Sequence, residues 1–292
     1  MSVTAGLAKR KKSSRKRHRL SLEDREQMQK LCLMDNDFMN IALDDNNACV
    51  EEMLRVILGK EDLKVTRVRT QSTIQGFSRS ICLDIDADDS EGRRYDIEMQ
   101  QASEGAEPRR ARFHGAMMDS RALKAGQNFK DLPERYVIFV TRDDVLGLEQ
   151  TLYMIHEYID GSLQPFDDGA HIIYINGAAK DDGSALWKLI HDLQCAKASE
   201  MYFPCLAARV RFLKEDEEGK AKMASYFEAK MANYFEEQRE KIAKKAEKQA
   251  QESFAVRLIR RGKDTLDEIA DCTGLTLRRV KSLAKTAGMA TA

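Results

Sequence analysis

The chain has 292 residues, enough for one large domain or a core domain with appendages, and its 42% of hydrophobic residues suffice for a packed core. No window approaches the roughly 18 consecutive apolar residues that a membrane span needs, and the basic start lacks the apolar segment of a signal peptide. We therefore expect a cytoplasmic protein with no membrane partner. The six scattered cysteines have no C-x-x-C spacing, which argues against a zinc site or a disulfide framework.

The formal net charge is zero, but the charge is unevenly spread. Residues 9–19 hold eight Lys/Arg and no acid, which leaves 40 basic and 48 acidic residues elsewhere. This balance excludes a protein coated in positive charge, and it allows a basic arm together with an acidic site. We expect residues 1–20 to be a disordered basic arm, either solvated or gripping phosphates without reading sequence.

In chain order, the pattern first predicts a short helix over 22–34 and then an amphipathic helix that Gly59 ends. Strands are predicted at 63–73, 80–86 and 93–100, and a helix follows at 107–125 with Phe113, Ala116 and Met117 facing inward. The apolar run 135–141 predicts a central buried strand, with further strands at 150–159 and 170–177. From 184 onward the pattern is helical. This order predicts an α/β fold, with a mixed central sheet flanked by helices and a helical C-terminal extension.

The two strands at 80–86 and 93–100 carry acids at alternate positions. If they pair as a hairpin about residue 91, Ile81, Leu83 and Ile85 share one face with Tyr95, Ile97 and Met99. The opposite face then carries Asp84, Asp86, Asp96, Glu98 and Gln100. Asp84 lies opposite Glu98, where like charges repel. Either water screens this face and nothing binds there, or a divalent cation sits between the acids.

Asp84, Glu98 and Gln100 form a D-x(13)-E-x-Q arrangement inside the segment 65–100. Together with segments 110–141 and 191–223 and the "DNDFM" stretch, it resembles the PD-(D/E)XK nuclease superfamily. More specifically, the chain is similar to the recombination-promoting nuclease and transposase family over roughly residues 33–235. The resemblance implies a restriction-endonuclease-like PD-(D/E)XK core.

The resemblance also implies roles for individual residues. Asp84 would bridge a metal ion and the scissile phosphate, and Glu98 would be the second ligand of a Mg²⁺ or Mn²⁺ ion. Gln100 takes the place of the superfamily's usual lysine, and a glutamine can hydrogen-bond but supplies neither a base nor a charge. The superfamily often has one more acid on the helix before the sheet. Glu52 is the candidate, the alternative being an ordinary exposed glutamate.

Other polar residues near these segments have two interpretations each. Arg109, Arg110 and Arg112 either contact DNA phosphates or form surface ion pairs. Gln71 either hydrogen-bonds near the site or is a polar residue at a strand edge. We expect His114 to pack on its helix without a catalytic role.

The C-terminal region suggests further modules. We expect the nuclease-like core to span 21–215, a long charged helix 216–252, and a helix-turn-helix-like segment 253–292. In that segment Leu266, Ile269 and Val280 belong to an apolar skeleton around Gly274. It is either a DNA reader, through Arg278, Arg279 and Lys281, or a plain packing unit. The long helix could pair two copies into a homodimer.

The favoured function is a metal-dependent DNA endonuclease linked to recombination or mobile DNA. The alternative is a catalytically decayed core that acts as a DNA-binding or interaction protein. A third reading is a metal-binding regulator with no nucleic-acid partner.

Overall fold

The computed structural model describes residues 21–76, 78–102 and 105–286, so the basic arm expected at 1–20 lies outside the described residues. The chain divides into two compact units, and the boundary between them in the sequence falls between Tyr226 and Phe227. None of the described helices is long and apolar enough to cross a membrane.

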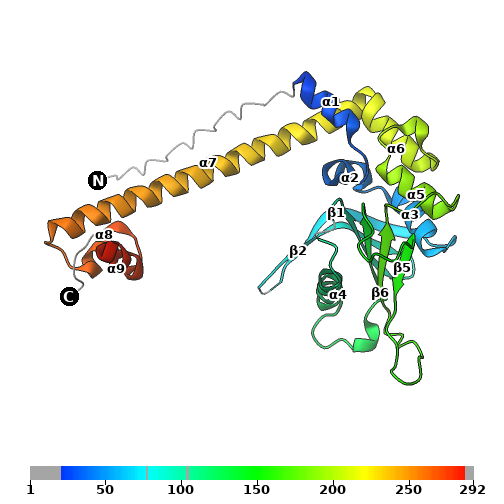
Figure 1. Ribbon diagram of the computed structural model, residues 1–292, viewed down its shortest axis with the longest axis horizontal. Helices are drawn as coiled ribbons and strands as arrows, with labels where there is room; N and C mark the ends of the chain where they lie inside the picture. Colours follow the sequence, from blue (N-terminus) through cyan, green and yellow to red (C-terminus); the bar gives the residue numbers. More distant parts are fainter. Residues whose placement is uncertain (1–20, 77, 103–104, 287–292) are drawn as a thin grey trace, which may run out of the picture. The chain divides into compact units, whose positions relative to one another are not determined.

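The first unit is built on a six-stranded mixed sheet with the strand order β1-β2-β3-β4-β6-β5 (Figure 1). β1, β2 and β3 are antiparallel, β3, β4 and β6 are parallel, and β5 is an antiparallel edge strand. The strands are β1 (Val65–Ile74), β2 (Ile81–Asp89), β3 (Arg94–Gln100), β4 (Arg135–Thr141), β5 (Leu152–Ile155) and β6 (Ala170–Asn176). Every residue of β4 after Arg135 is buried, which confirms the predicted central strand.

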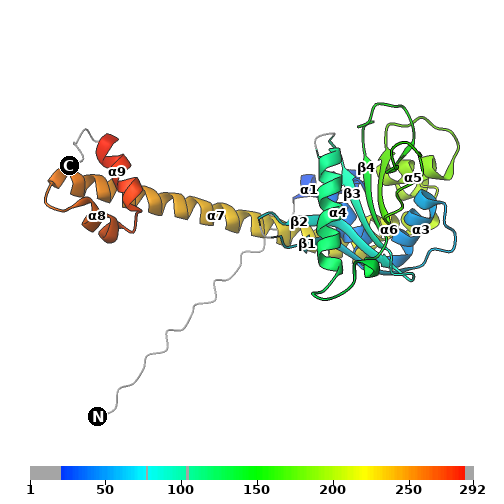
Figure 2. The same ribbon diagram turned by 90° about the horizontal axis from the view of Figure 1, so that it is seen from below.

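Helices cover both faces of this sheet, as predicted. The helices are α1 (Leu22–Lys30), α2 (Asn36–Leu43), α3 (Asn47–Leu58), α4 (Pro108–Ala122), α5 (Ala185–Gln194) and α6 (Pro204–Glu215), with 3₁₀ turns at Phe129–Asp131 and Ala198–Glu200. α4 lies across one face, and α2 and α3 pack on the other with α5 and α6 behind them (Figure 2). α3 ends at Gly59, whose φ of 64° suits a left-handed helix end, as the sequence indicates.

The inward face predicted for α4 is wrong. Phe113 is 38% exposed and Ala116 is also exposed, although Met117 does pack against the core. The buried residues of this helix are Ala111, His114, Gly115 and Met118.

The packing beneath α4 explains this orientation. Gly115 lies over Arg135, and a Cβ atom at position 115 would lie only 2.3 Å from Nη1 of that arginine. The glycine lets the helix lie directly over the guanidinium, which a larger residue would displace. At the preceding position, the buried His114 has a carboxylate partner in Asp96, so a polar side chain can face the sheet.

The predicted hairpin register is confirmed, because Ile85 pairs with Ile97, Asp86 with Asp96 and Ala87 with Tyr95. The assignment of faces holds only for part of β2. Ile81 and Leu83 pack in one core cluster with Val137 and Phe139, which pair with Asp96 and Glu98. Ile81 and Leu83 therefore lie on the same side of the sheet as Asp96 and Glu98, contrary to the strict alternation that we predicted. The change occurs where the β2–β3 pairing stops, at Ile85 and Ile97, although β2 stays paired with β1 as far as Ile81.

The helix α7 (Glu217–Arg261) begins in the first unit and belongs to the second unit from Phe227 onward. The second unit also contains α8 (Leu266–Thr273) and α9 (Leu277–Thr286). α7 is a single helix that continues to Arg261, beyond the end at residue 252 that the sequence suggested for the long helix. Ala255 and Ile259 from α7 pack against Ile269, Ala270 and Val280 from the two short helices. Between the short helices, Gly274 has a φ of 69° and the Thr276 hydroxyl accepts a hydrogen bond from the backbone N–H of Arg279. The predicted two-helix skeleton around Gly274 is therefore present.

The orientation of α4 can be tested by truncating one residue on each of its faces. Met118→Ala should lower the free energy of unfolding by about 2–5 kcal/mol, because it leaves a cavity in the core. Phe113→Ala should cost less than about 1 kcal/mol, because that ring is partly in water. Urea unfolding of both variants measures this, and the reverse ranking would contradict the orientation.

Candidate active site

Asp84 and Glu98 lie where β2 and β3 part. Beyond the last backbone pair of the hairpin, the Glu98 carboxylate accepts a hydrogen bond from the backbone N–H of Asp84 at 3.0 Å. The Asp84 carboxylate in turn accepts one from the backbone N–H of Met99 at 3.0 Å. Two acidic side chains thus replace the backbone ladder across the gap. Both are buried, so the reading of this face as open to solvent is wrong.

A glutamine from β1 holds the other oxygen of Asp84. Gln71 Nε2 donates to Asp84 Oδ1 at 3.1 Å and to Asn36 Oδ1, at the start of α2, at 2.9 Å. The φ of Gln71 is 52°, an uncommon value for a strand residue that is not glycine. Strained backbone of this kind is frequent at functional sites. Of the two interpretations of Gln71, the structure supports hydrogen bonding at the site.

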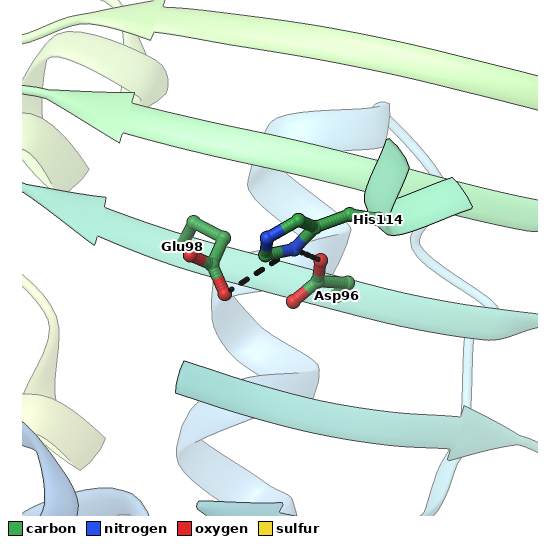
Figure 3. Close-up of side chains that lie close together, drawn as sticks. All are labelled: Asp96, Glu98 and His114. Atoms are coloured by element: carbon green, nitrogen blue, oxygen red, sulfur yellow. Dashed lines mark hydrogen bonds and ion pairs between the residues drawn. The ribbon is translucent and has the colours of Figure 1, made fainter. Parts of the chain in front are cut away.

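α4 brings a cation and an imidazole onto the acids. Arg110 Nη2 donates to Glu98 Oε2 at 2.6 Å. Figure 3 shows His114 beside Asp96 and Glu98, with its Nδ1 at 2.8 Å from Asp96 Oδ2 and 3.8 Å from Glu98 Oε1. His114 is buried, and its contacts are with the acid cluster rather than only with its own helix as we expected.

The two remaining acids of this face have different partners. Asp86 forms a two-pronged ion pair with Arg67 of β1, at 3.0 and 3.1 Å, and the same arginine also donates to Asp88 at 2.6 Å. Asp96 is fully buried, and its Oδ1 has no hydrogen-bond partner.

Burial dominates the electrostatics of this cluster. It raises the pKa of Glu98 to about 9, and the neighbouring Asp96 and Asp84 charges add to the shift. Burial likewise raises the pKa of Asp96 to about 8 and raises the pKa of Asp84. It lowers the pKa of His114, which favours a neutral imidazole at neutral pH. The cluster therefore favours any bound positive charge that would let its carboxylates ionise.

The residues present fit a divalent cation. Carboxylate oxygens are the ligands that Mg²⁺ and Mn²⁺ prefer, and the unpartnered Oδ1 of Asp96 is a buried oxygen available to a cation beside Glu98. Donor atoms of Asp96, Glu98 and His114 all lie within 4.8 Å of one another. Asp84 is not part of this group of three, although its backbone N–H donates to the Glu98 carboxylate.

Gln100 joins this cluster, and Glu52 does not. Gln100 Nε2 lies 3.5 Å from Glu98 Oε2, and its Oε1 accepts from Arg110 at 3.3 Å. No hydrogen bond or ion pair among the described residues joins Glu52, on α3, to the acids. Its neighbour Glu51 instead accepts the backbone N–H of Val65 at the start of β1.

The predicted DNA-contacting arginines separate into two groups. Arg110 points into the site, whereas Arg109 and Arg112 are exposed on α4. In the second unit, Arg278 and Lys281 are exposed on α9. Arg279 forms a two-pronged ion pair with Glu252 of α7, at 2.9 Å on both branches.

The raised carboxyl pKa values predict how stability depends on pH. In EDTA-treated protein, Glu98 and Asp96 keep their protons to about pH 8–9 when folded but lose them near pH 4 when unfolded. The folded state binds more protons in this interval, so the free energy of unfolding falls as pH rises. We expect the Tm of the EDTA-treated protein to fall between about pH 5 and pH 8.

Two comparisons isolate the acids. Glu98→Gln should flatten the pH dependence of the Tm, because an amide does not titrate. Mg²⁺ or Mn²⁺ should raise the Tm of the wild type most at high pH, where the cation does not compete with protons. A wild-type Tm that stays constant or rises over this range would contradict the buried protonated carboxyls.

Comparison with known proteins places this geometry in a family. The family model described as PD-(D/E)XK nuclease family transposase matches residues 37–257. Searches among curated proteins and among solved structures gave no match. The mixed sheet with helices on both faces and the helical C-terminal region agree with the PD-(D/E)XK fold that the sequence implies. Because the match covers most of the chain, the protein belongs to the PD-(D/E)XK nuclease family transposases.

Proposed function

We propose that the protein is a metal-dependent DNA endonuclease linked to recombination or mobile DNA. The observation that carries the proposal is the interlocking of Asp84 and Glu98 across the strand gap. Such an arrangement is costly without a ligand, because it buries several carboxyl groups beside few cations. Asp84 and Glu98 would hold a Mg²⁺ or Mn²⁺ ion, and Asp96, whose Oδ1 has no hydrogen-bond partner, would be a further ligand.

The reaction is hydrolysis of a phosphodiester. The oxygen of a water molecule bonds to phosphorus, the bond from phosphorus to one ester oxygen breaks, and that oxygen takes up a proton. The products are a phosphate monoester and a hydroxyl end. A bound divalent cation polarises the phosphate and makes the attacking water more acidic.

The chain's own side chains supply orientation. Gln71 fixes Asp84 from β1, and Arg110 fixes Glu98 from α4. Gln100 lies beside Glu98, where its amide can hydrogen-bond to water or to a phosphate oxygen.

The alternative is a decayed nuclease core that binds DNA or another partner without cutting. Gln100 in place of the lysine keeps this alternative open. The third reading, a metal-binding regulator without nucleic acid, predicts no affinity for DNA. Cleavage and binding assays separate the three.

Supercoiled plasmid should be nicked by the wild type with Mg²⁺ or Mn²⁺ and not in EDTA. Asp84→Asn and Glu98→Gln should each lower the rate on the order of 10²–10³-fold, because each removes charge at the reacting centre while keeping its shape. Glu61→Gln, at an exposed position outside the cluster, is the matched control and should cut like the wild type. A folded wild type that binds DNA without nicking it would favour the decayed-core alternative.

The same assay decides the role of Glu52. A loss in Glu52→Gln comparable to that in Glu98→Gln would support the additional acid. An unchanged rate would remove Glu52 from the site.

DNA affinity is proposed to come from exposed basic residues on α4 and α9, together with the basic arm. Arg278→Gln and Lys281→Gln should each reduce the slope of log K against log salt concentration by about 1, the effect of losing one phosphate contact. Arg279→Gln should reduce it less, because Glu252 already holds this guanidinium. Fluorescence anisotropy with a labelled duplex measures the slopes, and unchanged slopes in the first two variants would make the C-terminal segment a plain packing unit.

Two further expectations remain proposals. Cutting of both strands by a homodimer paired through the long helix is tested by measuring molecular mass in solution. The functional division into a core at 21–215, a linking helix at 216–252 and a DNA-binding segment at 253–292 is tested by binding assays on the full chain with substitutions in each part.

A further inference from the structure

The site lacks the cation that the family resemblance leads one to expect on β3. Gln100 occupies the lysine position, and an amide carries no charge. Phosphodiester cleavage accumulates negative charge on the phosphate oxygens, so a cation near them lowers the barrier. The question is whether another residue supplies that charge.

Arg110 is placed to do so. Its guanidinium donates to Glu98 Oε2 at 2.6 Å, to the backbone oxygen of Gly105 at 2.8 Å and to Gln100 Oε1 at 3.3 Å. It also lies over the ring of Phe139, at 5.8 Å from the centroid. The guanidinium therefore touches the side chain at the lysine position and one of the proposed metal ligands at once.

A hydrogen-bond chain from the sheet holds Arg110 in this position. Arg110 Nε donates to His114 Nε2 at 3.3 Å, so this ring nitrogen is the acceptor and Nδ1 carries the proton. Nδ1 then donates to Asp96 Oδ2 at 2.8 Å. His114 and Asp96 thus act as positioning residues for the arginine, which accounts for the burial of this histidine on α4.

Gly105 makes room for the contact between Arg110 and Gln100. Its φ is 126°, and a Cβ atom there would lie 2.7 Å from Gln100 Oε1 and 3.1 Å from Arg110 Nη1. A side chain at this position would push the pair apart. The loop before α4 therefore approaches the site closely without obstructing it.

Arg110 also remains accessible. Its side chain is 35% exposed, whereas Glu98 beneath it is fully buried. This partial exposure leaves part of the arginine side chain accessible to a phosphate that reaches the site. Arginine suits this task because its planar fork can serve several acceptors at once.

We propose that Arg110 supplies from α4 the positive charge that the superfamily lysine supplies from the strand, and that it orients Gln100 by holding its carbonyl oxygen. The Gln100 amide nitrogen then faces the reacting atoms as a hydrogen-bond donor only. This inference rests on the proposed nuclease function, and it names a catalytic cation that the D-x(13)-E-x-Q arrangement lacks.

The test moves the charge from the helix to the strand. Arg110→Gln keeps a hydrogen-bond donor but removes the charge, and it should lower kcat for plasmid nicking about a hundredfold. Gln100→Lys placed in that background should recover at least about tenfold, because a lysine on β3 restores the charge at the site. Gln100→Lys alone should not exceed the wild type, because two cations would then crowd one place. Arg110→Lys keeps a charge and is the variant to use if Arg110→Gln does not fold by circular dichroism. It should retain part of the activity.

A binding measurement gives a second readout that does not need cleavage. With Ca²⁺ in place of Mg²⁺, Arg110→Gln should reduce the salt slope of duplex binding by about 1, and the double variant should restore it. Cleavage by Arg110→Gln within threefold of the wild type would overturn the inference while leaving the nuclease function intact. So would a folded double variant no faster than Arg110→Gln. A wild type that never cuts would instead defeat the nuclease function, and an unchanged salt slope would then defeat a phosphate contact by Arg110 as well.

Discussion

Burial of several carboxyl groups at one strand gap is the constraint on which the rest of the site depends. Asp84, Asp96 and Glu98 lie together out of water, and carboxylates cannot remain ionised there without partners. The surrounding elements supply those partners in turn: backbone N–H groups from β2 and β3, an amide from β1, and a guanidinium and an imidazole from α4.

The hairpin and its acids could be predicted because side chains in a strand alternate between two faces every second residue. Alternation along two strands and a turn between them fix which residues oppose each other, and the observed pairing of Asp86 with Asp96 agrees. The central strand and the helix that ends at Gly59 could be predicted as well. A continuous apolar run indicates a buried strand, and a glycine after an amphipathic segment indicates a helix end. The burial of the acidic residues could not be predicted from the sequence, because alternation does not say what packs against that face.

The face of α4 could not be predicted by the same reasoning. Apolar periodicity predicts that Phe113, Ala116 and Met117 face inward, yet His114 and Arg110 are the residues that contact buried acids from another segment of the chain. Gly115 could have served as a signal, since a small residue within a helix marks a close approach by something else, here Arg135. The unusual backbone of Gln71 has no sequence signal, because glutamine rarely adopts a positive φ.

The strand gap has a mechanical consequence. From Asp84 and Glu98 onward, β2 and β3 are held together by side chains rather than by paired main chains. Widening that gap would exchange a few carboxylate contacts for contacts to an incoming group, and the sheet's own backbone bonds would stay intact. The two acids that join the strands at this point are therefore also the groups that a ligand would engage.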